Sequence, residues 1–436
     1  MSRFVRSPWA RAVGAVLLAN ACFLALSLVS LVPRETVERR IQTAFAAGEL
    51  VDADYLPFDA RRGWHQYNDC LLLQLLSNEN PSPIQRALAP AIYTNAVEDR
   101  KCAMLRALVT ASIGRDTLVR SQYARYWHGS RVPVALGLRR LELAQVRTIL
   151  AGTVWCAILV LALVAYKSGP RTRLTGLGIA VAAATVWAVP YFAPGLTHGP
   201  GDAALLLGLA VVIAWPRLTM TFRGIVPYAA AFGCVIGFFD MLTGQLPIAA
   251  AWLAALTLAS NRDQRQAEGV AAARGVALMA FFAFAAGACA TILVKQAIAV
   301  SLTEPGVAGQ FASNLRLYMS VPDYEDGWPG MLEPFGRLFR KSGNLTYGNA
   351  VAGYAMVVAM VVAWLAAAIR GWQTRDHYRG PDRLVILSAA LIPVVWTLVL
   401  PNHTYIHAGF MVRILVVPLA LAPVALFWPT EGREVT

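Results

Sequence analysis

Charged residues are scarce in this sequence. Of its 436 residues only 14% are Asp, Glu, Lys or Arg, whereas 57% are hydrophobic and the mean hydropathy is +0.52. Because soluble domains carry about 25% charged residues, this composition excludes an ordinary soluble protein. Apolar runs of about 20 residues recur along the chain, which is the length that crosses a bilayer as a helix. The sequence therefore predicts a polytopic membrane protein.

Cysteine is also scarce, and its placement excludes two classes of protein. Six cysteines are too few for a dense disulfide framework, and they form no Cys-x-x-Cys or Cys/His metal pattern. Four of them lie in apolar runs. Cys70 and Cys102 lie in a polar segment, where they could form one bridge if that segment is outside the cytoplasm. The sequence leaves the distance between them open.

Long basic runs are absent, although the net charge is +13. Nucleic-acid-binding proteins concentrate Lys and Arg in one patch or stripe, whereas here these residues are scattered or stand at the ends of apolar runs. Neither an internal repeat nor a low-complexity tract is present. Membrane topology accounts for the basic residues better than nucleic-acid binding does.

Lys and Arg also assign the two sides of the membrane. If the N-terminus is cytoplasmic, the short connections that carry Lys or Arg are cytoplasmic and those that carry neither are outside, as the positive-inside rule requires. The predicted cytoplasmic connections are 167–173, 216–223, 261–274 and 370–383; the outer ones are 194–201, 240–247 and 401–409. The predicted spans are 12–32, 148–166, 174–194, 202–216, 225–239, 247–260, 274–300, 349–369, 383–400 and 410–428.

The predicted fold is all-α and polytopic, with about ten transmembrane helices and a large helical outer loop after the first span. Its parts are the N-terminal tail with the first span (1–32), a periplasmic loop (33–147), transmembrane helices 2–7 (148–300), a second periplasmic loop (301–348), and transmembrane helices 8–10 with a cytoplasmic tail (349–436). Within the first loop we expect helices at 36–47 and 96–113, and an amphipathic surface helix at 136–143.

Clusters of aromatic, charged and imidazole side chains all fall on the predicted outer side. A carboxylate there could deprotonate a hydroxyl group, cations could hold a phosphate, and rings could pack on a sugar or an isoprenoid. We therefore predict Asp69 as a general base, and Lys295 and Arg413 as phosphate ligands. The predicted contacts to donor or acceptor are Tyr67, Arg125, Trp127, His128, Asp240, His403 and His407.

Each of these residues also has a purely structural interpretation. Asp69 could be a solvated loop acid, and Trp127 could belong to an interfacial aromatic belt. Lys295 and Arg413 could extend their charged groups toward lipid headgroups. The two histidines near residue 405 could be ordinary loop residues; no Glu stands between them as in a zincin, so we predict no metal site there. Asp240 is harder to explain structurally, because ionisable groups at membrane depth usually have a role.

The arrangement resembles the GT-C class of integral-membrane glycosyltransferases. In that class a long outer loop follows the first span and carries an acidic residue that serves as catalytic base, and the donor is a polyprenyl-phosphate sugar. Asp69 matches that residue best by its setting, with Asp59 and Asp54 as rivals. The chain lacks a clear Asp-Asp or Glu-x-Asp pair at the start of the loop, so the resemblance leaves a need for a divalent metal open.

Three local motifs resemble those of a bacterial membrane-protein family associated with arabinofuranosyl transfer to pilins. They are Tyr126-Trp127-His128-Gly129, Phe239-Asp240-Met241-Leu242-Thr243 and Asn402-His403-Thr404-Tyr405-Ile406-His407. The resemblance implies an inner-membrane glycosyltransferase whose active site faces the periplasm. Its partners would be a polyprenyl-phosphate sugar, which acts as co-substrate, and a protein or glycan acceptor. The alternatives are a transporter or flippase of lipid-linked sugars, transfer of an acyl or phospho group, and a non-catalytic envelope assembly protein.

Overall fold

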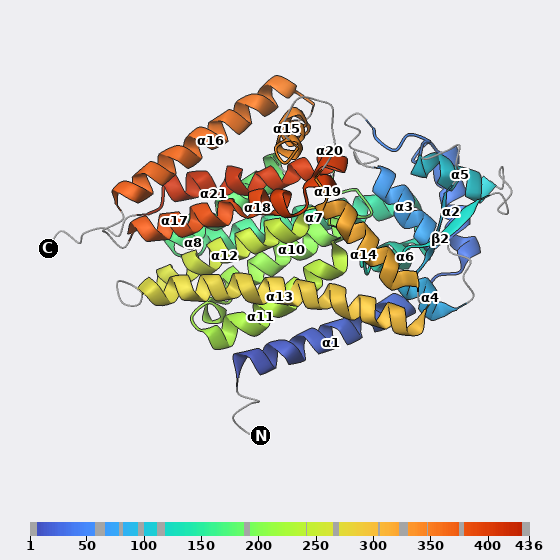
Figure 1. The fold of residues 1–436 in the computed structure, drawn as a ribbon, viewed down its shortest axis with the longest axis horizontal. Coiled ribbons are helices and arrows are strands. Elements are labelled where there is room, and N and C mark those ends of the chain that lie inside the picture. Colours follow the sequence, from blue (N-terminus) through green and yellow to red (C-terminus); the bar gives the residue numbers. More distant parts are fainter. Residues whose placement is uncertain are drawn as a thin grey trace.

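The computed structural model describes residues 7–56, 66–77, 82–94, 100–110, 118–186, 192–240, 242–264, 270–303, 306–321, 330–346, 348–374 and 379–429. Most of these residues are helical, and the long helices run along the longest axis of the molecule (Figure 1). Shorter helices gather at one end of that axis. The arrangement is a helical bundle with a cap of short elements over one end.

The bundle contains the long apolar helices. They are α1 (Pro8–Val29), α7 (Leu143–Tyr166), α8 (Pro170–Thr185), α10 (His198–Ala214), α11 (Phe222–Phe239), α12 (Gln245–Gln264), α13 (Val270–Leu302), α16 (Ala350–Gln373), α17 (Arg379–Ala390), α18 (Ile392–Val399) and α21 (Val416–Leu426). Local signals fix where several of them begin: Pro8 stands at the first position of α1, and Glu142 and Gln145 form a capping box at α7. The Asn349 side chain accepts the Ala352 N–H at the start of α16.

Short elements connect these helices at both ends. Those of the first loop are α2 (Arg34–Ala46), α3 (Gln66–Leu76), α4 (Pro83–Leu88), β1 (Ala91–Thr94), α5 (Lys101–Thr110), β2 (Val119–Gln122) and α6 (Arg131–Leu138), which we call the loop layer. Farther along the chain come η2 (Pro216–Leu218), α14 (Gly306–Met319), α15 (Glu333–Arg340), η3 (Ser342–Thr346), α19 (Pro401–Ile406), α20 (Ala408–Met411) and η4 (Val412–Leu415).

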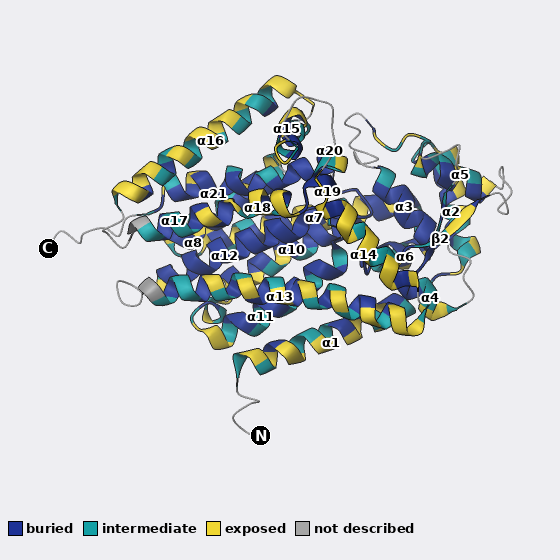
Figure 2. Cartoon of the chain, in the orientation of Figure 1, coloured by how far each residue is buried: buried dark blue, intermediate teal, exposed yellow. Residues whose placement is uncertain are grey.

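The side faces of the bundle are apolar. Leu18 on α1, Leu163 on α7 and Val351 on α16 are 67%, 60% and 77% exposed, which in water would be unfavourable over so wide a surface. Figure 2 shows exposed residues along the outer faces of α1 and α16 and buried ones along α12. Every residue of α12 from Gln245 to Arg262 is buried, so this helix forms the centre of the bundle.

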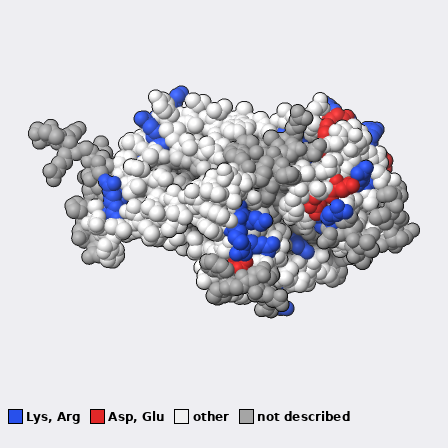
Figure 3. Space-filling view, turned by 90° about the horizontal axis from the view of Figure 1, so that it is seen from above, with Lys and Arg blue, Asp and Glu red and all other residues white. Residues whose placement is uncertain are grey.

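Charge is distributed as a membrane protein requires. The face drawn in Figure 3 is largely uncharged, and most of its Asp and Glu side chains lie toward the end that carries the loop layer. Among the described residues, seven helices are long and apolar enough to cross a membrane. These observations confirm the prediction of a mostly helical, multi-pass membrane protein.

The number of spans remains a prediction. Each predicted segment contains a helix, but three of these helices are not among the seven. α8 and α10 are only 16 and 17 residues long. α12 is long but ends in the polar residues Asn261 to Gln264. A central helix with no face toward lipid needs no continuous apolar surface, because its polar end can pair with neighbouring helices.

The four connections predicted to be cytoplasmic meet at one end of the bundle. Asp263 accepts the backbone N–H groups of Arg171 and Thr172, and Asn261 donates to the carbonyl of Thr219. The carboxylate of Asp382 pairs with both Arg262 and Arg274, at 2.8 and 2.9 Å. The grouping of these connections on one side is therefore confirmed, and the loop layer lies at the other end (Figure 1).

The loop layer differs from the prediction in two places, the segment 136–143 and a small sheet. The expected amphipathic helix at 136–143 is wrong: α6 ends at Leu138 and α7 begins at Leu143. The guanidinium of Arg139 in the intervening turn donates to the carbonyls of Val29 and Leu31 at the end of α1, which favours a turn there over a continuous helix. The helix expected at 96–113 is α5, described over Lys101–Thr110. The small antiparallel sheet of β1 and β2 was not predicted; it pairs Ala91 with Gln122 and Thr94 with Val119.

Cys70 on α3 and Cys102 on α5 are joined by a disulfide, which answers the question that the sequence leaves open. The other four cysteines are free. The bridge lies in an apolar core shared by α2, α3, α5, α6 and the start of α7, with Ile41, Leu105 and Val146 among its members. It therefore fastens two helices of the loop layer to each other beside the bundle.

We expect the double substitution Cys70→Ser and Cys102→Ser to destabilise the loop layer. The bridged residues are 32 positions apart, and closing a loop of that length stabilises a protein by about 3–4 kcal/mol. Thermal unfolding of the purified protein in detergent should show a lower Tm than for the wild type. The matched control is Cys156→Ala with Cys289→Ala, two free cysteines; equal Tm values for both double variants would contradict the prediction.

Candidate functional site

A polar cavity of about 310 Å³ lies between the loop layer and the end of the bundle. Its walls come from α3, β1, α5, β2, α14, α19 and α20, from the segment that follows β2, and from Thr243 in the turn before α12. The polar side chains that characterise it are four tyrosines, two cations and two imidazoles: Tyr67, Tyr123, Tyr126, Tyr318, Lys101, Arg125, His403 and His407. Among the described residues that line it, none is Asp or Glu. The cavity thus presents hydrogen-bond donors and positive charge.

Arg125 is the cation with the most ordered setting. Its guanidinium donates to the Tyr318 hydroxyl at 3.0 Å and lies over the Tyr123 ring, 5.1 Å from its centroid. Its Nε atom is buried and has no partner among the described residues. Burial raises the pKa of Tyr67 to about 12 and also raises the pKa of Tyr123. The phenols are therefore neutral at physiological pH and can donate hydrogen bonds beside the guanidinium.

His403 has one ring nitrogen engaged and one without a partner. Nε2 lies 2.8 Å from the carbonyl oxygen of Leu242, whereas Nδ1 is buried with no partner among the described residues. Burial lowers the pKa of His403 to about 4, against the opposing effect of the Leu242 carbonyl, so the ring is neutral at pH 7. The ring centroids of Tyr318 and His407 lie 4.6 and 4.8 Å away.

Asp69 does not line the cavity, although its neighbours Tyr67 and Asn68 do. Its carboxylate is 1% exposed and forms an ion pair with Arg147 at 3.0 Å. It also accepts the N–H groups of Leu196 at 2.8 Å and Thr197 at 3.4 Å. Burial raises the pKa of Asp69 to about 6, with Arg147 opposing that effect. The geometry suits a buried structural ion pair better than a base that meets a substrate.

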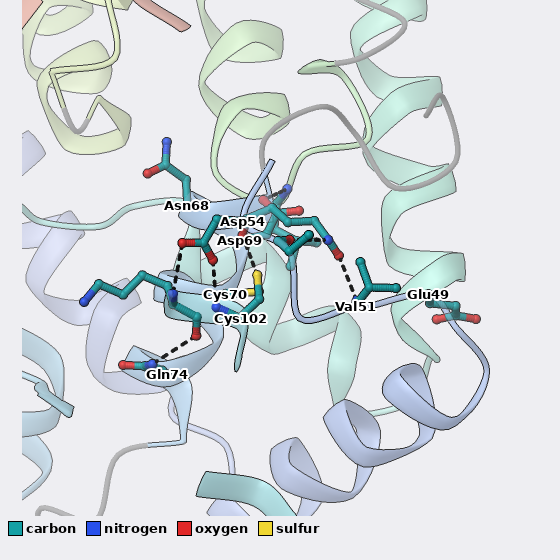
Figure 4. Close-up of a disulfide and its surroundings, with 12 residues drawn as sticks. Glu49, Val51, Asp54, Asn68, Asp69, Cys70, Gln74 and Cys102 are labelled. Atoms are coloured by element: carbon teal, nitrogen blue, oxygen red, sulfur yellow. Dashed lines mark hydrogen bonds between the residues drawn. A yellow bond between two sulfur atoms is a disulfide. The ribbon is translucent and has the colours of Figure 1, made fainter. Parts of the chain in front are cut away.

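The rival carboxylates occupy different positions. The Asp54 side chain accepts the backbone N–H groups of Lys101 and Cys102 at 3.0 and 2.9 Å, and so caps the start of α5 beside the disulfide (Figure 4). Gln66, in the same region, donates to the carbonyl of Ala53. Asp59 lies outside the described residues. Asp54 thus has a structural role in the loop layer.

Arg413 lies behind the cavity wall. Its guanidinium pairs with Asp202 at 2.6 Å, lies 3.1 Å from Nδ1 of His198, and is fully buried. Gln245 donates to the same carboxylate at 2.7 Å. The His198 ring is 6.0 Å from that of Phe410, which does line the cavity. Arg413 therefore ties α10 to the segment that carries part of the wall.

Two further predicted residues, Lys295 and Trp127, connect the cavity segment to α13. The Lys295 ammonium donates to the carbonyl of Ala124, and Gln296 donates to the carbonyls of Ala124 and Arg125, both at 2.9 Å. The indole N–H of Trp127 donates to the carbonyl of Thr291 at 3.1 Å. These bonds hold in place the stretch that carries Arg125.

His128 and Asp240 shape two tight turns. His128 is buried with a left-handed backbone (φ 56°), and its ring is 5.1 Å from that of Tyr123. The Asp240 carboxylate accepts the N–H and hydroxyl of Thr243, at 2.6 and 3.0 Å, and the N–H of Leu246 at 2.9 Å. Asp240 thereby fixes the turn between α11 and α12.

The structure brings together Tyr67, Arg125, His403 and His407 at the cavity, and places the other predicted residues in its supports. Lys101, Tyr318 and the two partners of Arg413, Asp202 and His198, were not predicted from the sequence. Asp202 carried a signal, since it is a carboxylate at the edge of a predicted span. Tyr318 carried none, because a tyrosine near a membrane surface is common.

The described residues contain no group of three or more His, Cys, Asp or Glu placed to hold a metal ion. Comparison of the chain with protein-family models, with curated proteins and with solved structures found no match. The resemblance to GT-C glycosyltransferases therefore stays a prediction, and the argument for function rests on the chemistry of the cavity.

We expect Asp69→Asn to destabilise the fold, because it leaves the buried Arg147 without its counter-charge. Breaking one partner of a buried ion pair costs about 3–5 kcal/mol. The double variant Asp69→Leu with Arg147→Met removes both charges and should recover part of the loss. Thermal unfolding in detergent measures both effects. An Asp69→Asn protein as stable as the wild type but unable to transfer a sugar would instead support Asp69 as the base.

Proposed function

We propose that this protein is a membrane glycosyltransferase that moves a sugar from a polyprenyl-phosphate donor to a protein or glycan acceptor outside the cytoplasm. The observation that carries the proposal is the cavity itself. It combines Arg125, Lys101 and buried phenols with no described carboxylate in its walls, and it lies at one end of an apolar helical bundle. Such a site favours an anionic ligand that approaches from a membrane.

A phosphate group fits the polar part of the cavity. Guanidinium and ammonium groups form the strongest hydrogen bonds to phosphate oxygens, and a guanidinium can bind two of them at once. The hydroxyl groups of Tyr67 and Tyr318 add further hydrogen-bond donors. Aromatic rings beside them offer flat apolar faces to a sugar ring. The cavity thus offers hydrogen-bond donors to the phosphate of the lipid-linked sugar and aromatic faces to its sugar ring.

A long apolar chain fits a second feature. A cleft of about 220 Å³ with almost wholly apolar walls lies between α15, α16, α18 and α21, with Phe335, Trp364 and Val394 among its lining residues. α18, which forms one wall of this cleft, leads into α19, which carries His403; η4, which forms another, follows Phe410. Consecutive segments of the chain therefore border the apolar cleft and the polar cavity, which supports an amphiphilic donor.

The rival function is transport or flipping of lipid-linked sugars. Transporters place their binding residues near the membrane midplane, between repeated halves. Here the cavity lies at one end of the bundle beneath the loop layer, and the sequence shows no repeat. Transfer at the membrane surface accounts for that position better than passage across the membrane.

We expect Arg125→Ala to weaken binding of undecaprenyl phosphate about 10- to 100-fold, because a hydrogen bond to a charged group contributes about 1.5–3 kcal/mol. Native mass spectrometry of the purified protein with added lipid measures the change. Arg120→Ala is the matched control, since Arg120 is an exposed residue of β2 that does not line the cavity. Equal loss in both variants would mean that general charge, not the cavity, binds the lipid.

Mass spectrometry of envelope glycans and secreted proteins tests the reaction. A deletion strain should lack one sugar mass, which the wild-type gene restores and the Arg125→Ala gene restores poorly. Loss of an acyl or phosphate mass in place of a sugar would replace glycosyl transfer by that reaction. An unchanged envelope would overturn the proposed transfer altogether.

A further inference from the structure

A transferase that adds a sugar to a hydroxyl group must also remove the hydroxyl proton, and general bases do this in most enzymes. Burial raises the pKa of Tyr67, Tyr123 and Tyr126, which holds these phenols in their protonated form. Arg125 and Lys101 have no acceptor to offer. Asp69 is engaged behind the wall. Among the described lining groups, the two imidazoles remain as proton acceptors.

The hydrogen bond of His403 fixes which of its nitrogens can accept a proton. A backbone carbonyl oxygen can only accept a hydrogen bond, so Nε2, at 2.8 Å from the Leu242 oxygen, carries the ring hydrogen. In the neutral ring the lone pair is then on Nδ1. That atom is buried without a partner among the described residues, and buried polar atoms of this kind are rare and often belong to functional sites.

The Leu242 carbonyl is itself held in position. Leu242 has a left-handed backbone (φ 59°), which is uncommon for a leucine and persists only where the surroundings enforce it. The enforcement comes from Asp240, whose carboxylate accepts hydrogen bonds from Thr243 and Leu246 on the far side of the turn. Asp240 thus fixes the turn, and the turn places the Leu242 carbonyl where it orients the imidazole of His403.

We propose that Nδ1 of His403 accepts the proton of the acceptor hydroxyl during sugar transfer, and that Asp240 is the positioning residue that sets the tautomer and orientation of that ring. This inference rests on the proposed function. It assigns the proton-accepting role to an imidazole that the cavity contains, rather than to the buried carboxylate that sequence analysis favoured.

The acceptor oxygen forms a bond to the anomeric carbon while the bond from that carbon to the phosphate oxygen breaks. The electron pair of the broken bond leaves with the polyprenyl phosphate, which gains one negative charge. The acceptor's proton moves to Nδ1 and makes His403 a cation, which then passes the proton to the departing phosphate or to water.

The charge of the donor would assist this transfer. Burial lowers the pKa of His403, and a phosphate bound beside it would act in the opposite direction by favouring the imidazolium. The neighbouring groups include no described carboxylate: they are Tyr318 on α14, His407 after α19, and Arg125, which is bonded to Tyr318. His403 would therefore become an effective base only when the anionic donor is present.

The test uses membranes of a deletion strain that express each variant, with lipid-linked sugar extracted from that strain as donor. His403→Ala should lower kcat about 100- to 10,000-fold, the usual contribution of a general base, with KM for the donor within about twofold of wild type. Added imidazole should restore part of the rate to His403→Ala. His407→Ala is the matched control, because His407 lines the same cavity but lacks the bond to Leu242, and imidazole should not restore its rate.

Asp240→Asn should lower kcat less than His403→Ala does, and should add no further loss when combined with it, since Asp240 acts through His403. If the losses of kcat caused by the two substitutions were fully additive in the double variant, the positioning role of Asp240 would be overturned. A His403→Ala protein with wild-type kcat, in membranes where the wild type transfers sugar, would overturn the base assignment alone. Absence of sugar transfer by the wild type would overturn the proposed function instead.

Discussion

The ion pair between Asp69 and Arg147 is the contact on which the arrangement of the cavity depends. It joins α3 of the loop layer to the second turn of α7, and the same carboxylate accepts two N–H groups just before the start of α10. A buried pair of this kind contributes little net stability, but neither partner can move without leaving a charge unpaired. It therefore fixes the position of α3, and with it the wall formed by Tyr67 and Asn68.

The opposite wall is fixed by hydrogen bonds to backbone carbonyls rather than by an ion pair. Gln296, Lys295 and Trp127 all engage backbone carbonyls, either on the segment that carries Arg125 or on α13. These bonds hold the segment through its backbone atoms and do not involve the Arg125 side chain. The guanidinium of Arg125 can therefore face Tyr318 and the cavity. The bundle thus supplies a rigid frame, and the loop layer supplies polar side chains of varied chemistry.

The helical bundle and the grouping of the basic connections at one end of it could be predicted from the sequence, because apolar length and the placement of Lys and Arg are physical requirements of a bilayer. The site could be predicted only in part. Clusters such as 123–131 and 402–407 were visible as unusual composition, yet which member faces the cavity depends on packing. On α3, Tyr67 lines the cavity and Asp69, two residues on, points into the protein. Helical rotation separates them, and a carboxylate alone does not reveal its orientation.

Cations also divide into two groups by their partners. Arg147, Arg413 and Arg262 are each paired with a buried carboxylate, so their charge is neutralised within the protein. Arg125 has a phenol and an aromatic face as its partners, and forms no ion pair with a described carboxylate. Neutral partners compensate the desolvation of a guanidinium less fully than a carboxylate does. An anionic ligand would complete that compensation, which fits the cations and phenols that line the cavity between the loop layer and the bundle.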